Sequence, residues 1–241
     1  VAHPEVSLST EQAAALESAL ARLQSGEPLP YILGHWEFYG LDFCVASGVL
    51  IPRPETETLV YAAVAFIRSN FLRSDPVIAD IGTGSGAVAV SLARLFPRAR
   101  VYATDMSRQA LDIAALNCIR HGVRVEILQG DLLAPLPQSV DVIVANLPYV
   151  ADVELSGLSP EIRDHEPRIA LSGGADGLDI IRRLIVDAGE KLRAGGVVLV
   201  EIAPSQADIL KGWIARSGLW PGVEPVYDDG GIVRVLKLSG I

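Results

Sequence analysis

Residues 146–149 read Asn-Leu-Pro-Tyr and directly follow the apolar run Val140–Ala145. A carboxamide or exocyclic amine nitrogen is a poor nucleophile, because its lone pair is delocalised into the attached π system. The Asn146 side-chain oxygen and the Leu147 carbonyl can both accept N–H bonds from such a nitrogen and turn its lone pair toward an electrophile. Pro148 favours an extended Leu147 and so directs that carbonyl, and Tyr149 can stack on the planar group.

The residues 146–149 have a second interpretation, a turn that ends a strand, since Asn and Pro are common in turns. Under that interpretation Tyr149 is simply a core residue. The first interpretation predicts an enzyme that modifies a planar nitrogen, and it requires a neighbouring site for the electrophilic donor.

A glycine-rich turn lies upstream, between an expected strand and an expected helix. Glycine permits a tight turn and a close approach of the backbone to a ligand. The spacing is neither G-x-G-x-x-G nor that of a phosphate-binding P-loop. An ordinary strand-to-helix turn is the alternative. The candidate donor-binding residues of the turn are Gly82, Thr83, Gly84, Ser85 and Gly86.

Acidic residues follow the next two expected strands. Asp105 lies 23 positions after Gly82, where a carboxylate can accept bonds from both ribose hydroxyls of an adenosine group. Asp131 and Leu132 can flank the adenine, with the carboxylate near its amine and Leu132 against its face. The alternatives are a helix N-terminal flank for Asp105 and an ordinary turn for Asp131. Asp80 is expected at least to brace the turn.

Strand and helix patterns alternate from residue 77 onward, which predicts an α/β fold with right-handed crossovers and a mainly parallel, seven-stranded sheet. The last two strands are expected to form an antiparallel hairpin at the sheet edge. The long segment 150–178 is expected to be irregular and functional. The expected strands are 77–81, 100–104, 124–128, 140–145, 196–202, 222–226 and 232–238, and the expected helices are 86–96, 108–121, 179–192 and 205–217.

The N-terminal part has weaker patterns. Ser9 and Gln12 form a capping-box signature for a helix over 10–24. Residues 31–51 contain Trp36, Phe38, Tyr39 and Phe43 among scattered glycines and predict a short hairpin or an extended segment. Pro54 is expected to open a helix that runs to about Phe71.

Ligands bind beyond the carboxyl ends of parallel strands, so Asn146 is expected beside the glycine-rich turn and near the donor.

The composition excludes some classes of protein. The net charge of −9 disfavours stable binding to long nucleic acid, which requires a basic surface. The two cysteines and four histidines lack disulfide or metal-ligand spacing, so no metal site is expected. No apolar run is long enough to span a membrane, and no secretory signal is visible. A cytoplasmic protein is therefore expected. The first residue is Val, which is consistent with a trimmed chain.

The chain resembles the class I S-adenosylmethionine-dependent methyltransferases with a Rossmann-like fold. More closely, it resembles the protein-(glutamine-N5) methyltransferases of peptide chain release factors, the PrmC or HemK family. The run 50–57 and the Arg-Asp-His-Glu-Pro sequence are the more specific motifs, whereas many methyltransferases share the glycine-rich turn. The segments that carry the resemblance are Gly26–Gly34, Glu37-Phe38, Val49–Glu57, Asp80–Gly86, Asn146–Tyr149, Glu161–Arg168 and Gly173–Gly177.

The resemblance implies three parts: a remnant of a small helical domain over 1–30, a β-hairpin over 31–52 and a methyltransferase domain over 53–241. It implies S-adenosylmethionine as cofactor, S-adenosylhomocysteine as product, and a release factor as the protein partner, methylated on the glutamine of its Gly-Gly-Gln loop. Asn146–Tyr149, with Arg53 and Glu57 shaping the pocket floor, are then the substrate-binding residues. A monomer is expected.

One residue departs from the family pattern, which has Asn-Pro-Pro-Tyr where this chain has Leu147. A Leu supplies a backbone carbonyl as well as Pro does, so the chemistry is expected to persist. Asn-Leu-Pro-Tyr is also typical of rRNA adenine-N6 dimethyltransferases, and a nucleic-acid adenine-N6 methyltransferase that stacks Tyr149 on a flipped base is the main rival. The run Pro-Arg-Pro-Glu-Thr-Glu favours glutamine. A catalytically silent cofactor-binding scaffold is a further rival, against which the intact Asn146 argues.

Overall fold

The computed structural model describes residues 7–71 and 75–240, which form a seven-stranded sheet and a separate two-stranded hairpin. The sheet order is β5-β4-β3-β6-β7-β9-β8, in which neighbouring strands from β5 to β7 are parallel and β9 is antiparallel to β7 and β8. The predicted α/β fold and the antiparallel edge hairpin are confirmed. The strands are β3 Val77–Ile81, β4 Arg100–Asp105, β5 Glu126–Gln129, β6 Val140–Ala145, β7 Leu192–Glu201, β8 Gly222–Tyr227 and β9 Val233–Ser239.

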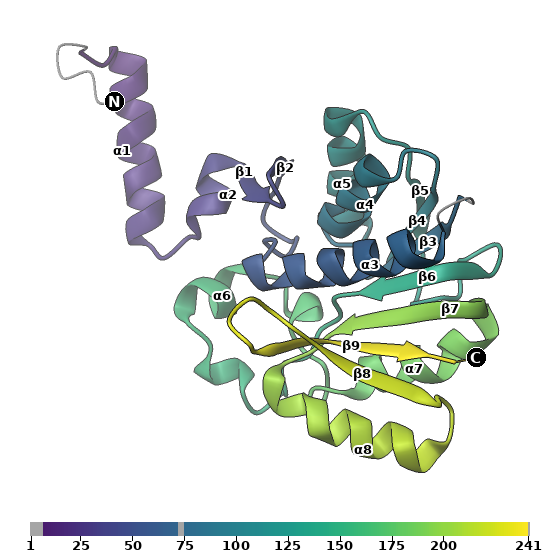
Figure 1. The fold of residues 1–241 in the computed structure, drawn as a ribbon. Helices are drawn as coiled ribbons and strands as arrows, with labels where there is room; N and C mark the ends of the chain where they lie inside the picture. Colours follow the sequence, from purple (N-terminus) through teal and green to yellow (C-terminus); the bar gives the residue numbers. More distant parts are fainter. Residues whose placement is uncertain (1–6, 72–74, 241) are drawn as a thin grey trace.

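Helices cover both faces of this sheet (Figure 1). The apolar residues of β6 show why, because they alternate between two cores: Val140 and Ile143 belong to one cluster, Val142 and Val144 to the other. A strand buried on both faces reads as a continuous apolar run. The helices on one face are α3 Glu57–Asn70, α4 Ala87–Leu95 and α5 Arg108–His121, and those on the other are α7 Asp179–Lys191 and α8 Ala207–Ser217.

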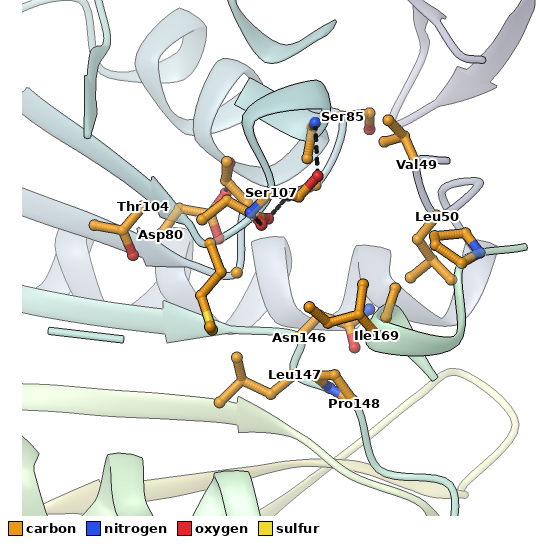
Figure 2. A pocket seen from close by; sticks show the side chains of 18 of the residues that line it. Val49, Leu50, Asp80, Ser85, Thr104, Ser107, Asn146, Leu147, Pro148 and Ile169 are labelled. Atoms are coloured by element: carbon orange, nitrogen blue, oxygen red, sulfur yellow. Dashed lines mark hydrogen bonds between the residues drawn. The ribbon is translucent and has the colours of Figure 1, made fainter. Parts of the chain in front are cut away.

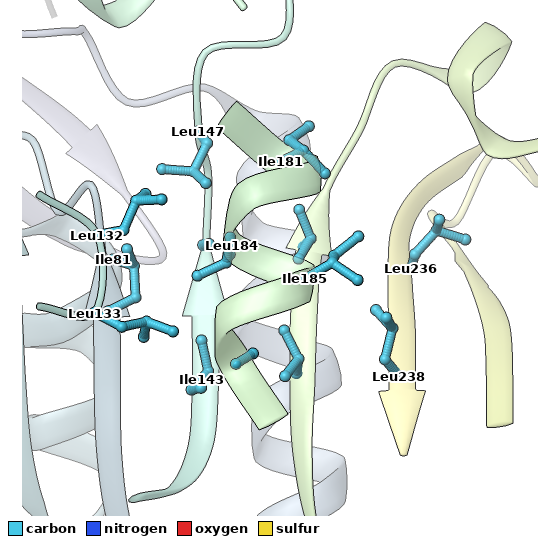
Figure 3. Packing of buried hydrophobic residues seen from close by; sticks show 14 of the residues in the cluster. Ile81, Leu132, Leu133, Ile143, Leu147, Ile181, Leu184, Ile185, Leu236 and Leu238 are labelled. Atoms are coloured by element: carbon cyan, nitrogen blue, oxygen red, sulfur yellow. The ribbon is translucent and has the colours of Figure 1, made fainter. Parts of the chain in front are cut away.

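Helix α7 closes the core on its face of the sheet. Ile181, Leu184 and Ile185 project from one side of this amphipathic helix and lie over the strands that carry Ile143 and Leu236 (Figure 3). Burying one such side chain stabilises the fold by about 2 kcal/mol. The packing fixes the position of the strand ends above it, where the segment after β6 begins.

The N-terminal part projects from this body (Figure 1). Helix α1 Thr10–Gln24 starts at the predicted capping box of Ser9 and Gln12, and none of its residues is buried. The hairpin comprises β1 His35–Phe38 and β2 Leu41–Cys44. One expectation was wrong. Residues 31–33 belong to a second helix, α2 Leu29–Leu33, instead of the hairpin, because Pro30 suits a first helical turn and Gly34 ends the helix in a left-handed conformation.

Other boundaries differ from the expected ones by a few residues. Strand β7 begins at Leu192 instead of 196, and a register irregularity lies where it meets β6. Helix α3 begins at Glu57, after the 3₁₀ turn η1 Pro54–Thr56. The segment 150–178 is irregular as expected, although it contains the short helix α6 Pro160–His165 and two 3₁₀ turns, η2 Leu155–Gly157 and η3 Arg168–Ala170.

One buried amide ties the hairpin to the main domain. Asn117 of α5 is fully buried; its Oδ1 accepts from the Cys44 amide at 2.7 Å, and its Nδ2 donates to the Cys44 carbonyl at 3.0 Å and to the Ser85 carbonyl at 2.8 Å. Ser85 belongs to the glycine-rich turn. Asn117 therefore holds three segments together that are distant in the chain.

We predict that Asn117→Ala lowers the free energy of unfolding by about 3 kcal/mol, because it leaves buried backbone groups unpaired. Urea denaturation measures this loss. Asn70→Ala is the control: Asn70 is exposed, and among the described residues its side chain hydrogen-bonds only within its own helix, so its replacement should change stability by less than about 0.5 kcal/mol. Equal effects of the two substitutions would contradict the anchoring role of Asn117.

Candidate active site

A pocket lies at the carboxyl ends of β3, β4 and β6, where the sequence predicts a site. Figure 2 shows Asn146, Leu147 and Pro148 on one side of it and Asp80, Ser85 and Ser107 on the other. The structure thus brings most of the predicted donor and acceptor residues together. The predicted residues that line the pocket are Gly82, Thr83, Gly84, Ser85, Asp105, Asp131, Leu132, Asn146, Leu147 and Pro148.

The glycine-rich turn is held from beneath by a buried carboxyl. Asp80 accepts from the Thr83 hydroxyl at 2.7 Å and from the Ala89 amide at 3.0 Å. Burial raises the pKa of Asp80 to about 7, although the bond from Thr83 opposes that rise. The amides of Gly82 and Thr83 also donate to the Thr104 carbonyl, each at 2.9 Å. The turn is therefore preformed, and Asp80 braces it as expected.

Gly86 lies outside the pocket lining and allows two helices to pack closely. It is the N-cap residue of α4, with a φ of 81°, and a Cβ there would lie 3.0 Å from the Ala114 Cβ. Only glycine combines this left-handed backbone with such a close approach between α4 and α5. Its predicted contact with a cofactor stays a prediction.

Asp105 occupies the helix-flank position of one interpretation, and its contact with a ribose stays a prediction. Its Oδ2 accepts from the Gly84 amide at 2.9 Å, and its Oδ1 accepts from the Ser107 amide at 2.8 Å, next to the N-cap of α5. Burial is the main cause that raises the pKa of Asp105, and these backbone bonds oppose it. A carboxylate has further lone pairs, so Asp105 can also accept from a ligand in the pocket that it lines.

The predicted adenine-flanking residues lie at another corner of the pocket. Asp131 forms an ion pair with Arg183 of α7, a partner that the sequence did not indicate. Leu132 has a φ of 46°, an unusual conformation for a residue with a branched side chain, and the Thr104 hydroxyl donates to its carbonyl at 3.0 Å. Such strain persists only where the surroundings enforce it, and it is concentrated at functional sites.

The acceptor-side residues touch the glycine-rich turn directly. A Cβ at Gly82, where φ is 71°, would lie 2.9 Å from Leu147 Cδ2. The amide of Asn146 has a defined orientation, because its Nδ2 donates to the Thr56 hydroxyl oxygen at 2.9 Å. Its Oδ1 is therefore the atom left to accept a bond in the pocket that Asn146 lines.

Three predicted substrate-binding residues lie outside the pocket lining. Tyr149 is half-buried and packs against the core on the α7 face, and its carbonyl accepts from Gln206 at 2.8 Å. Arg53 forms an ion pair with buried Glu166, and Glu57 accepts from the Tyr39 amide at 2.9 Å. The substrate contacts of these residues stay predictions.

Sequence reasoning missed several lining residues. Thr56 belongs to the Pro-Arg-Pro-Glu-Thr-Glu run, in which the sequence points to Arg53 and Glu57 as substrate-binding residues but not to Thr56. Glu166, which ties the segment 150–178 to the Ile51 amide at 3.3 Å, holds one pocket wall in place. Lining residues contributed by the loop after the hairpin, by the segment 150–178 and by α7 are Gly48, Val49, Leu50, Pro52, Pro167, Ile169, Ala170, Ile180 and Arg183.

Two general features are absent from residues 7–71 and 75–240. None of the helices there is both long and apolar enough to cross a membrane. In the same residues, His, Cys, Asp and Glu side chains form no group of three that could hold a metal ion.

Comparison with known proteins places this geometry in context. Residues 62–159 match the family model "Methyltransferase small domain", and residues 1–34 match "PrmC N-terminal domain". A similar solved structure is the 16S rRNA N2 G1207 methyltransferase of T. thermophilus in complex with AdoMet and guanosine. It has a TM-score of 0.60 and 16% identity, and the alignment covers 86% of this chain and 50% of that one. At this identity the likeness shows the fold alone, which is that of a class I methyltransferase.

Curated relatives are closer in sequence. A release factor glutamine methyltransferase of Geobacter sulfurreducens is 42% identical over 95% of this chain and 79% of its own length. Another, of Moorella thermoacetica, is 43% identical over 96% of this chain and 81% of its own length. Identity at this level over nearly the whole chain confirms the resemblance found in the motifs. The chain therefore belongs to the release factor glutamine methyltransferase family.

Proposed function

We propose that this protein transfers a methyl group from S-adenosylmethionine to the side-chain amide nitrogen of a glutamine in a peptide chain release factor, the glutamine of its Gly-Gly-Gln loop. The observation that carries the proposal is the orientation of Asn146. Thr56 holds its Nδ2, which leaves Oδ1 to accept an amide N–H beside the glycine-rich turn. The curated relatives are named release factor glutamine methyltransferases, which supports this substrate class.

The donor half of the pocket fits S-adenosylmethionine. Gly84 has a φ of 56°, and a Cβ there would meet no atom of the described chain within 4 Å, so its backbone faces open space. Asp105 would hold the ribose hydroxyls, and Asp131 with Leu132 would flank the adenine. The bound cofactor supplies an electrophilic methyl group on a sulfonium centre.

The acceptor half would position the glutamine nitrogen. Asn146 Oδ1 and the Leu147 carbonyl accept its two N–H bonds and hold the nitrogen in line with the methyl group. The same two oxygens stabilise the positive charge that develops on nitrogen. Pro148 limits the conformations of Leu147 and so fixes the second acceptor. A base before attack is unnecessary, because the nitrogen loses its proton readily once it is cationic.

Further parts of the proposal come from the sequence and from the family resemblance. They are a division at residues 30 and 52 into a helical segment, a hairpin and a methyltransferase domain, a monomeric state, a cytoplasmic location and no stable complex with nucleic acid. The net charge of −9 supports the last of these.

Incubation with methyl-labelled cofactor tests the substrate class. We expect label on a release factor but not on RNA, and mass spectrometry should find one added methylene mass on the loop glutamine. The matched control is the same release factor with that glutamine replaced by glutamate. Labelling of RNA adenine in place of release factor would support the rival and overturn the proposal.

We predict that Asn146→Ala lowers kcat about a hundredfold, since the loss of one transition-state acceptor costs about 3 kcal/mol. Cofactor affinity, measured by calorimetry, should stay within about twofold, because an interaction made only in the transition state adds nothing to binding. Turnover close to that of the wild type would end the proposed role of Asn146.

We predict that Gly84→Ala weakens cofactor binding at least about tenfold, because a methyl group would occupy space that the close approach of the ligand to the backbone requires. Gly122→Ala is the matched control: Gly122 also has a left-handed φ, 63°, and open space around a Cβ, but it ends α5 outside the pocket lining. Both substitutions should lower stability by about 1 kcal/mol. Calorimetry with S-adenosylhomocysteine should find an affinity loss in the first alone.

A further inference from the structure

A buried carboxyl group lies next to the acceptor residue. Glu201 is the last residue of β7 and is only 2% exposed. Ala145 of β6 pairs with Val200 in parallel register, so Asn146 and Glu201 leave neighbouring strands side by side. Glu201 Oε2 has no hydrogen-bond partner among the described residues. A buried carboxyl oxygen without a partner costs stability, so a use in the active site would explain its presence.

The groups that face Glu201 come from three other elements. The hydroxyls of Thr56 in η1 and of Tyr149 after β6 face its carboxyl as potential donors, and Glu55 of η1 and Arg234 of β9 are the nearby charged groups. Burial is the main cause that raises the pKa of Glu201 to about 7; Glu55 adds to the rise, whereas Thr56, Arg234 and Tyr149 oppose it. Burial also raises the pKa of Tyr149 to about 12, so its phenol keeps its proton and donates.

The direction of the hydrogen bonds follows from counting protons. A hydroxyl has one proton and two lone pairs. Because Asn146 Nδ2 donates to the Thr56 oxygen, the Thr56 proton is free to go to another acceptor. An ionised carboxylate only accepts, and Glu201 is the carboxyl group that Thr56 faces. A chain of bonds can therefore run from Asn146 through Thr56 to Glu201, in which the first bond is the one at 2.9 Å and the second follows from the position of Glu201.

We propose that Glu201 is a positioning residue, which acts through the Thr56 hydroxyl to keep the Asn146 amide with Oδ1 toward the substrate nitrogen. The inference rests on the proposed function. In the flipped amide, Oδ1 would face Thr56 and take its proton, and Glu201 would lose a donor. The Asn146 NH2 group would then meet the substrate NH2 group, donor against donor, and the acceptor would be lost.

Glu201→Gln keeps the shape of the side chain but adds an NH2 group that can donate to Thr56, so either orientation of Asn146 becomes possible. We expect kcat with release factor to fall about tenfold, the factor that one hydrogen bond of ordinary strength supplies. Cofactor affinity should not change. The midpoint of thermal unfolding should not fall, because the substitution removes a buried charge; a merely structural role would lower it.

Glu55→Gln is the matched control. It removes a neighbouring negative charge, from a side chain that is 46% exposed, but it leaves the chain of hydrogen bonds intact. At a pH well above 7, where Glu201 is ionised with or without Glu55, kcat should therefore not change. Thr56→Val should lower kcat about as much as Glu201→Gln, and Thr56→Ser should recover most of that loss. The double variant that combines Thr56→Val with Glu201→Gln should be no slower than Thr56→Val alone. Additive losses would overturn the proposal.

The pH dependence gives a second test. A protonated Glu201 can donate to Thr56 as Gln does, so kcat of the wild type at saturating cofactor should fall as the pH drops through about 7. Saturation is needed because Asp80 titrates in the same range and supports the donor turn. Glu201→Gln should remove this decline. An unchanged profile in that variant would contradict the role of Glu201.

A spectroscopic measurement separates failure of this inference from failure of the proposed function. The side-chain NH2 signals of Asn146, assigned by their loss in Asn146→Ala, should shift with the same pH midpoint in the wild type and not in Glu201→Gln. No substrate is needed. If the wild type does not methylate a release factor, the proposed function fails and the Asn146 signal still tests the hydrogen-bond chain. If the Asn146 signal shifts neither with pH nor on the substitution Glu201→Gln, the inference itself is refuted.

Discussion

The parallel pairing of β3 with β6 is the constraint on which the site depends. Ile81 lies opposite Ala145, so the segments that follow these residues, the glycine-rich turn and Asn146–Tyr149, emerge side by side at one sheet edge. A shift of the pairing by one residue would reverse the faces to which the side chains point. Both faces are buried by helices, and this burial makes such a shift costly. The contact of Gly82 with Leu147 follows directly from this register.

Two carboxyl groups that support the site near this pairing are deeply buried. Asp80 beneath the donor turn and Glu201 beneath the acceptor side are both nearly inaccessible, and burial raises the pKa of each to about 7. Such groups lower stability, and the apolar cores on the two faces of the sheet offset this cost. The pocket thus combines preformed hydrogen-bond acceptors with a rigid scaffold, which spares reorganisation when charge develops in the reaction.

The elements that the sequence predicts best are those with a strong local pattern. Strands β3 and β6 have the expected bounds, as does helix α5, because a run of apolar residues or an N-cap Ser at one end and a Gly at the other defines them locally. Helix α2 was missed because its five residues are too few for a periodic pattern. Strand β7 is longer than expected, since Leu192 already pairs with Val140, before the register irregularity that precedes the pairing of Val197 with Val142.

The amino-acid sequence by itself determined the fold class, the glycine-rich turn, Asp105 and the Asn146–Tyr149 motif, because each of these depends on residue types at short spacing. Only the tertiary structure decided that Thr56 orients Asn146, that Arg183 pairs with Asp131 and that Glu201 lies beside the acceptor, while Tyr149, Arg53 and Glu57 lie outside the pocket lining. The physical reason is that these contacts join residues more than 50 positions apart in the chain, and spacing along the chain carries no information about which side chains meet when strands pair and helices cover them.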